Sequence, residues 1–304
     1  MIVIFILILI GVYLYKKGHL SNGLSKQLSW IIVNITNPIT LLCAAFSEEN
    51  KVSAGEVGIA FLCFIVMYAI LIPIAYLIPV LLRVDKSRRY AYRMLAIFGN
   101  VGFIGIPFSS AVLGTQSLIF VSICGLTFNM IIYTYGVASF KATAAVQNPE
   151  DNKGNEFTLK NIINSGTVFA VLTIAVYLMD VKIPDMVSNT LTYIGNCTTF
   201  LSMLVLGVSV AQMVPKEVFS RWRLYVFVVV RQILVPIAIV FILKPFITNQ
   251  LIISTVAVMA SMPAANLPLM MAKQFGVKED MISAGIILTT VASIITIPAV
   301  MYFL

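Results

Sequence analysis

Two apolar segments, one in each half of the chain, are interrupted by residues whose side chains and backbone could together hold an anion. The first interruption is Gly99–Pro107 and the second is Ser261–Pro268. Their asparagines, Asn100 and Asn266, offer amide donors and an acceptor without a fixed charge. A helix broken at such a point also has a second half whose N-terminus favours negative charge. The pattern indicates a site for a small anionic ligand.

The predicted site consists of the small and polar residues of both interruptions. The substrate-binding residues expected there are Asn100, Gly102, Pro263, Ala264 and Asn266. The two segments are expected to cross at their prolines, Pro107 and Pro268. The alternative for both asparagines is that they bond the freed backbone of their own break. We favour the site, because the half-helix N-termini beside them also attract an anion.

Arg231 is a strong cation within an apolar segment and is a further candidate ligand. Burying it in a bilayer costs ~2.5–3.5 kcal/mol on insertion scales, so a partner must compensate its charge. A substrate carboxylate could do so through two parallel hydrogen bonds. The alternatives are that Arg231 bonds carbonyls of a broken helix or reaches the membrane surface.

Three further polar residues are candidates of lower rank. Asn37, followed by Pro38, either lines the same cavity or belongs to a simple proline kink. Asn129 and Tyr133 lie one helical turn apart on one face, where hydrogen bonding between helices is the commoner role.

The elements that must position these residues are membrane-spanning helices. The chain has 304 residues, of which 60% are hydrophobic and 11% are charged, which excludes an ordinary soluble domain. A spanning helix needs about 20 apolar residues. Ten apolar segments are predicted spans: 2–15, 28–47, 57–82, 94–114, 117–140, 161–179, 187–213, 224–247, 251–272 and 281–304.

The basic residues predict the orientation of these spans. Alternate loops hold 16 of the 20 Lys and Arg, whereas the opposite loops hold three, namely Lys51, Lys182 and Lys244. The positive-inside rule then places both termini outside the cell. The net charge of +8 therefore reports topology rather than nucleic-acid binding.

A polar connection divides the chain into two similar halves. The predicted units are a first five-helix repeat, 1–142, a cytoplasmic linker, 143–160, and a second repeat, 161–304. Because each half has an odd number of spans, the second must be inverted relative to the first. Inverted repeats with a site near the bilayer midplane are typical of secondary transporters.

These segments resemble the auxin efflux carrier family, which includes plant auxin exporters and bacterial permeases for malate or malonate. The resemblance covers nearly the whole chain and is carried by Asn100–Pro107, by Met262–Gly276, by Asn37-Pro38, and by Arg231 with Pro236. It implies an all-α fold with spans four and nine crossing, and transport of an organic anion by alternating access. The shorter central loop and the Pro263–Asn266 sequence differ from the plant exporters, so auxin is not carried over as the substrate.

We therefore expect a multi-pass transporter of the cell membrane that moves a mono- or dicarboxylate. The twelve carboxylates fall in loops or at span edges, which argues moderately against a sodium-coupled symporter of the bile-acid type. A membrane receptor with the same fold is the other alternative. Coupling to protons or sodium and homodimerisation stay open. No ATP-binding loop, catalytic constellation or metal-ligand cluster is apparent, so no enzyme activity, cofactor, metal or nucleic-acid partner is expected.

Overall fold

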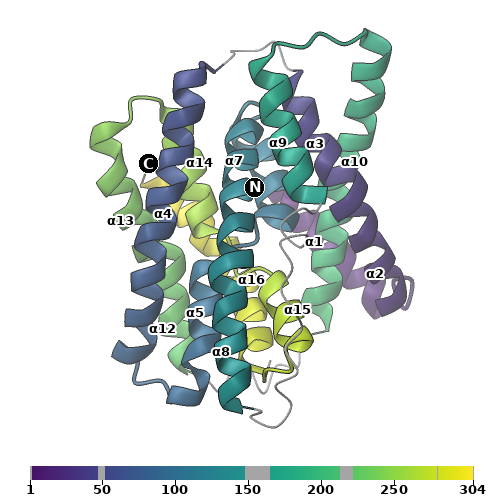
Figure 1. Ribbon diagram of the computed structural model, residues 1–304. Coiled ribbons are helices and arrows are strands. Elements are labelled where there is room, and N and C mark those ends of the chain that lie inside the picture. The colour runs from purple at the N-terminus through teal and green to yellow at the C-terminus, as the bar shows by residue number, and fades with distance from the viewer. Residues whose placement is uncertain (1, 47–51, 148–164, 213–221, 279, 304) are drawn as a thin grey trace.

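The computed structural model describes residues 2–46, 52–147, 165–212, 222–278 and 280–303. These residues form a bundle of helices, in which no strand occurs within the described ranges (Figure 1). The predicted linker begins inside a helix, since 143–147 complete α8, and residues 148–160 lie outside the described part of the chain.

The first half of the chain contains four helical units after α1 (Ile2–Lys16). Several of these are assembled from an α-helix, a π-helical turn (η) and a second α-helix. The elements are α2 (Asn22–Ile31), η1 (Ile32–Thr36), α3 (Asn37–Ala45), α4 (Ala54–Leu81), η2 (Lys86–Arg88, a 3-10 turn), α5 (Arg89–Ile97), η3 (Val101–Gly105), α6 (Ile106–Leu113), α7 (Ser117–Ile131), η4 (Ile132–Gly136) and α8 (Val137–Gln147).

The second half begins with α9 and has the same kinds of element. They are α9 (Ser165–Leu178), α10 (Asp185–Ala211), α12 (Trp222–Val229), η6 (Val230–Leu234), α13 (Val235–Leu243), η7 (Lys244–Phe246, a 3-10 turn), α14 (Gln250–Ser261), α15 (Leu267–Gln274) and α16 (Asp280–Tyr302).

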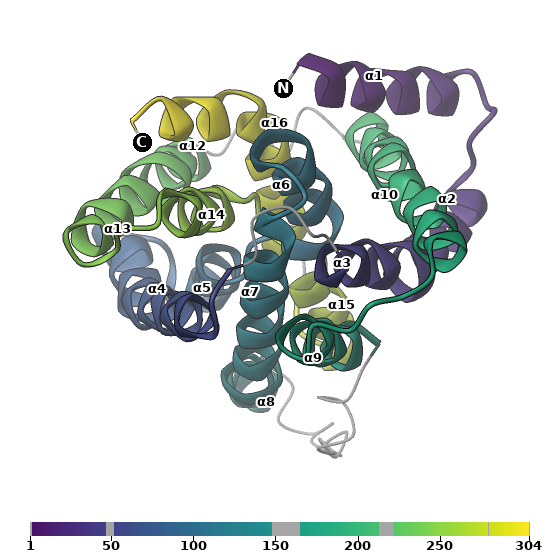
Figure 2. The same ribbon diagram turned by 90° about the horizontal axis from the view of Figure 1, so that it is seen from above.

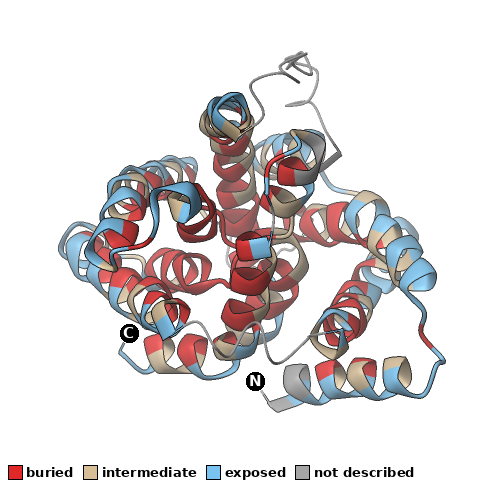
Figure 3. Cartoon of the chain, turned by 90° about the horizontal axis from the view of Figure 1, so that it is seen from below, coloured by how far each residue is buried: buried red, intermediate tan, exposed pale blue. Residues whose placement is uncertain are grey.

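Six helices in the described residues are long and apolar enough to cross a membrane. They are Asn22–Ala45, Ala54–Leu81, Ser117–Gln147, Asp185–Ala211, Trp222–Phe246 and Asp280–Tyr302. Large apolar side chains on their outer faces are exposed, such as Leu62, Phe241 and Ile295. In Figure 3 the buried residues gather toward the middle of the bundle, and the exposed ones lie on its periphery. A multi-pass membrane protein has this distribution because lipid solvates its outer surface.

π-Helical turns precede three of the prolines that the sequence singles out. η1 ends just before Asn37-Pro38, η3 before Ile106-Pro107, and η6 before Val235-Pro236. Proline has no backbone N–H and its ring clashes with the carbonyl four residues earlier. A widened turn accommodates both effects without ending the helix, and such turns often occur at functional sites.

The helices form two groups, with α6 and α7 between them (Figure 2). One group contains α1, α2, α3, α9 and α10, and the other contains α4, α5, α12, α13, α14 and α16. Within the first group α1 and α10 touch backbone to backbone. A Cβ atom added at Gly207 would lie 2.4 Å from the Ile8 carbonyl oxygen, and one at Gly11 would lie 2.6 Å from that of Leu204. Only glycine allows this approach.

Candidate functional site

Both predicted interruptions are present as breaks between helices, which confirms the prediction that these two apolar segments are interrupted. α5 ends at Ile97, and the helix resumes as the π turn η3 after Phe98–Asn100. α14 ends at Ser261, and α15 begins at Leu267. Each break therefore divides an apolar segment into two half-helices and frees backbone groups that need partners.

The freed backbone groups of one break bond those of the other. The amide of Asn100 donates to the carbonyl of Pro263 at 2.7 Å, and the amide of Ala265 donates to the carbonyl of Phe98 at 2.9 Å. These two bonds make an antiparallel bridge between Gly99 and Ala264. Residues predicted from two distant parts of the sequence are thus brought into direct contact.

Close contact at this bridge depends on small residues. A Cβ atom added at Gly99 would lie 3.2 Å from the Cβ of Met262. Ala264 is 2% exposed, and its amide donates to Thr289 Oγ1 of α16 at 3.1 Å. The two breaks are therefore held against each other and against α16, deep within the bundle.

Asn100 performs the backbone role that the sequence left as an alternative, but only with part of its side chain. Its Oδ1 accepts from the amide of Phe103 at 3.0 Å, which caps the N-terminus of η3. Its carbonyl accepts from the amide of Gly105 at 2.9 Å. Within the described residues its side-chain amide nitrogen has no hydrogen-bond partner, so that donor remains free for a ligand.

Asn266 and Asn37 also present uncommitted polar atoms beside the breaks. Asn37 Nδ2 donates to the carbonyl of Gly102 at 3.2 Å, while its buried Oδ1 has no partner in the described part of the chain. The Asn266 side chain is half-buried and makes no hydrogen bond to other described residues. Asn37 belongs to the helix group that contains α1, α2, α3, α9 and α10, and Gly102 belongs to the broken segment. The candidate site therefore lies between the two helix groups.

Arg231 lies behind the breaks and bonds the ends of two half-helices. Its side chain is 2% exposed. Nε donates to the carbonyl of Ala96, in the last turn of α5, and Nη1 donates to the carbonyl of Ala260, in the last turn of α14. The C-terminal end of a helix carries about half a negative charge. Two such ends compensate one guanidinium, which is the backbone alternative stated for Arg231.

Prolines and small residues take up positions around the same breaks. Pro268 stands in the first turn of α15, where a missing N–H costs nothing, whereas Pro107 follows the π turn η3 without a break in the helix. Pro263 supplies the carbonyl that pairs with Asn100, and all three prolines are buried.

The other two lower-ranked candidates, Asn129 and Tyr133, lie in α7 and η4. Asn129 Nδ2 donates to Thr167 Oγ1 at 3.0 Å and so joins α7 to α9, the interhelical role expected to be commoner. Tyr133 lies in the π turn η4 and is half-buried. Among the described residues, Asn129 therefore bonds α9 and not either break.

Two residues near the breaks were not singled out from the sequence. Gln232 is fully buried, and its Nε2 donates to the carbonyl of Thr289 at 3.0 Å, while its Oε1 has no partner in the described chain. Thr289 links α16 to both Gln232 and Ala264. The signal for Gln232 was its place beside Arg231 in an apolar segment; threonine gives no such signal, because it is common in membrane helices.

An all-helical membrane bundle in which two interrupted helices pair at their breaks is an architecture of membrane carriers. Residues 1–301 match the membrane transport protein family, and the chain belongs to this family, that of the auxin efflux carriers. It is 24% identical, over 97% of its own length and 95% of the other chain, to an uncharacterized transporter of Methanocaldococcus jannaschii. The family resemblance noted in the sequence is therefore confirmed, and the family is one of transporters.

Proposed function

We propose that this protein is a secondary transporter that carries a small organic anion across the cytoplasmic membrane by alternating access. Membership of a transporter family supports transport. The observation that supports an anionic substrate is the bridge between Gly99 and Ala264. Beside this bridge lie the N-termini of two half-helices and the free polar atoms of Asn100 and Asn266. Mono- and dicarboxylates such as malate or malonate carry the negative charge that these groups attract.

The proposed architecture is ten spans in two inverted repeats of five helices. Its support is that the described residues contain six long helices, two broken helices, Arg89–Leu113 and Gln250–Gln274, and the shorter α1 and α9. Together these would make ten spans. In this proposal the broken helices are spans four and nine and cross near the bilayer midplane, the loops rich in Lys and Arg face the cytoplasm, and both termini lie outside.

The division into two helix groups supports alternating access. The site lies on the boundary between them, where Asn37 of one group bonds the Gly102 carbonyl of the broken segment. A displacement of one group along this boundary would open the breaks first to one side of the membrane and then to the other. The Gly11–Gly207 contact lies inside one group and would be kept during that displacement.

The second candidate function is a sodium-coupled symporter. The position of Arg231 argues against it. Sodium binds carbonyl oxygens, and the carbonyls of Ala96 and Ala260 already accept from the guanidinium. A fixed cation thus stands where a coupling cation could otherwise bind. A receptor with the same fold remains the candidate from a different class.

Counterflow in proteoliposomes tests the proposal. Vesicles loaded with unlabelled malate or malonate should accumulate the labelled acid transiently in sodium buffer and equally in choline buffer. Protein-free vesicles are the control. Saturable binding with no exchange, for any mono- or dicarboxylate that stabilises the protein, would indicate a receptor, and exchange only in sodium would favour the symporter.

A further inference from the structure

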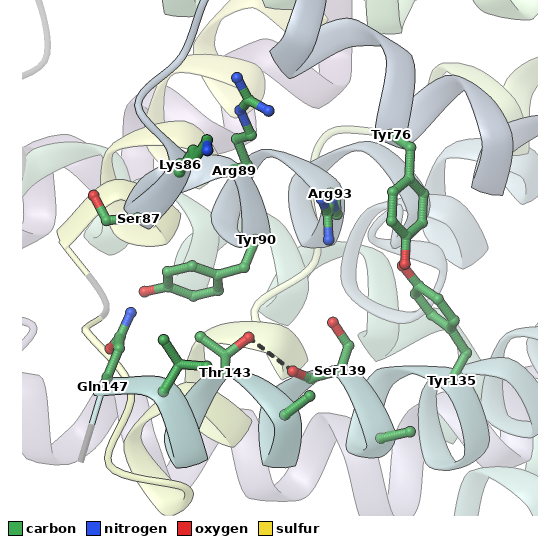
Figure 4. Close-up of a pocket in the computed structure, with 13 residues that line it drawn as sticks. Tyr76, Lys86, Ser87, Arg89, Tyr90, Arg93, Tyr135, Ser139, Thr143 and Gln147 are labelled. Carbon is green, nitrogen blue, oxygen red and sulfur yellow. Dashed lines mark hydrogen bonds between the residues drawn. The ribbon is translucent and has the colours of Figure 1, made fainter. Parts of the chain in front are cut away.

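A cavity separate from the breaks lies between α4, α5 and α8 (Figure 4). Its volume is about 630 Å³, and no recorded lining residue is acidic. The basic lining residues are Lys86, Arg89 and Arg93, and the polar ones include three tyrosines, Tyr76, Tyr90 and Tyr135.

Arg93 has no carboxylate partner among the described residues. Its guanidinium carbon lies 3.9 Å from the centre of the Tyr76 ring, a cation–π contact that holds the charge without neutralising it. The Tyr135 hydroxyl donates to that of Tyr76 at 3.1 Å, which fixes the ring. Arg93 Nε is buried and has no hydrogen-bond partner in the described part of the chain.

The other two basic residues differ in what they have available. Arg89 Nε donates to the carbonyl of Val84 at 2.9 Å, and Figure 4 shows its side chain turned away from α8. Lys86 is exposed at the rim. Arg93 and Lys86 therefore supply the positive charge, and Ser139, Thr143 and Gln147 of α8 line the opposite side with polar groups.

Apolar side chains of α8 stand beside these polar groups, and the cavity is open at its edge. Ala138, Ala142 and Val146 belong to its lining, and Val146 is 83% exposed. On α4 the exposed side chains of Ala69 and Pro73 precede Tyr76 on the same helical face, on the side away from the basic loop. A ligand with an anionic head and apolar chains matches this surface, whereas a soluble anion would use only its basic part.

We propose that this cavity binds the phosphate of an anionic phospholipid, with Arg93 and Lys86 on the headgroup and the acyl chains along α4 and α8. Basic pockets between membrane helices bind such headgroups, and tyrosines are enriched at that depth of the bilayer. A soluble phosphate ester would share the headgroup chemistry, so the experiment must separate the two. The proposal does not depend on which substrate the breaks bind.

The test is titration of the purified protein with dioctanoyl phosphatidylglycerol, followed by native mass spectrometry and thermal stability. Saturable retention and stabilisation are expected, with neither effect from dioctanoyl phosphatidylcholine. Arg93→Gln and Lys86→Gln should each weaken binding roughly fivefold, as expected for about 1 kcal/mol per basic residue. Arg93→Lys should recover part of the loss, because it keeps the charge.

Arg83→Gln is the matched control, because Arg83 is an exposed residue of the same basic loop and does not line the cavity. It should bind like the unmodified protein. An equal loss in Arg83→Gln, or no loss in Lys86→Gln and Arg93→Gln, would overturn the site. If glycerol 3-phosphate bound as tightly as the lipid, the lipid assignment would be overturned in favour of a soluble phosphate ester.

Discussion

Replacing Arg231 with alanine should destabilise the protein more than it changes the intrinsic affinity for substrate. The guanidinium donates to the carbonyls of Ala96 and Ala260, and both of these residues are at most 1% exposed. A hydrogen bond from a charged group contributes about 1.5–3 kcal/mol, and its loss leaves a buried carbonyl unsatisfied. Two such losses amount to roughly 3–6 kcal/mol.

The assay measures thermal stability in detergent. Substrate binding is measured separately and is normalised to the fraction of protein that remains folded. Arg231→Lys should fall between the original protein and Arg231→Ala, because an ammonium keeps the charge but cannot span two carbonyls with a planar fork. Guanidinium ion at millimolar concentration should restore part of the stability of Arg231→Ala by entering the vacated space. It should not restore Arg231→Met, in which a side chain fills that space.

Arg223→Ala is the control on the same helical unit. The Arg223 guanidinium lies 5.5 Å from the Trp222 ring, and this contact is worth only about 0.5–1 kcal/mol at an exposed ring. The reasoning on Arg231 fails if Arg231→Ala is as stable as Arg223→Ala and yet binds no substrate. That result would assign the guanidinium to the ligand in another conformation of the protein.

The other predictions concern the site, the α1–α10 contact and the topology. Asn100→Ala and Asn266→Ala should each weaken substrate binding by about 1–3 kcal/mol. Their double variant should lose less than the sum, because both side chains act on one ligand. Strict additivity in equilibrium binding would mean that the two breaks do not share a ligand. Gly207→Ala should cost about 1–3 kcal/mol of stability through overpacking against α1, whereas Gly58→Ala, whose added methyl meets no atom within 4 Å, should cost nothing in the same thermal assay. A single cysteine at Ser53 in a cysteine-free protein should react with an impermeant reagent from outside the cell and one at Ser87 only from inside, so that outside labelling at position 87 would reverse the proposed orientation.

Much of the fold follows from the sequence, because the signals that carry it are strong in a membrane. Long apolar segments must form helices, since lipid offers no partner for an open backbone. The two breaks could be predicted for the same reason, because asparagine, glycine and proline within such segments interrupt the helix. Their pairing was also expected, although the sequence could not identify Gly99 and Ala264 as the residues in contact.

The role of Arg231 could not be settled from the sequence, because it depends on where the helices end. A buried guanidinium needs negative charge, and the sequence offers either a substrate carboxylate or helix carbonyls without distinguishing them. In the structure the guanidinium donates to the carbonyls of Ala96 and Ala260, at the C-terminal ends of α5 and α14. The first residues of the predicted linker, 143–147, belong to α8, because polar residues such as Gln147 continue this helix.

The arrangement of half-helix ends explains why an anion is the substrate class we propose. Each helix end carries about half a charge, negative at its C-terminus and positive at its N-terminus. Arg231 compensates the C-terminal ends of α5 and α14, which together are equivalent to about one negative charge. The N-terminal ends of the continuous η3–α6 helix and of α15 then leave about one positive charge beside the bridge, with no carboxylate of the described break residues to balance it. One carboxylate of a substrate would complete the balance, held in place by the free side-chain atoms of Asn100 and Asn266.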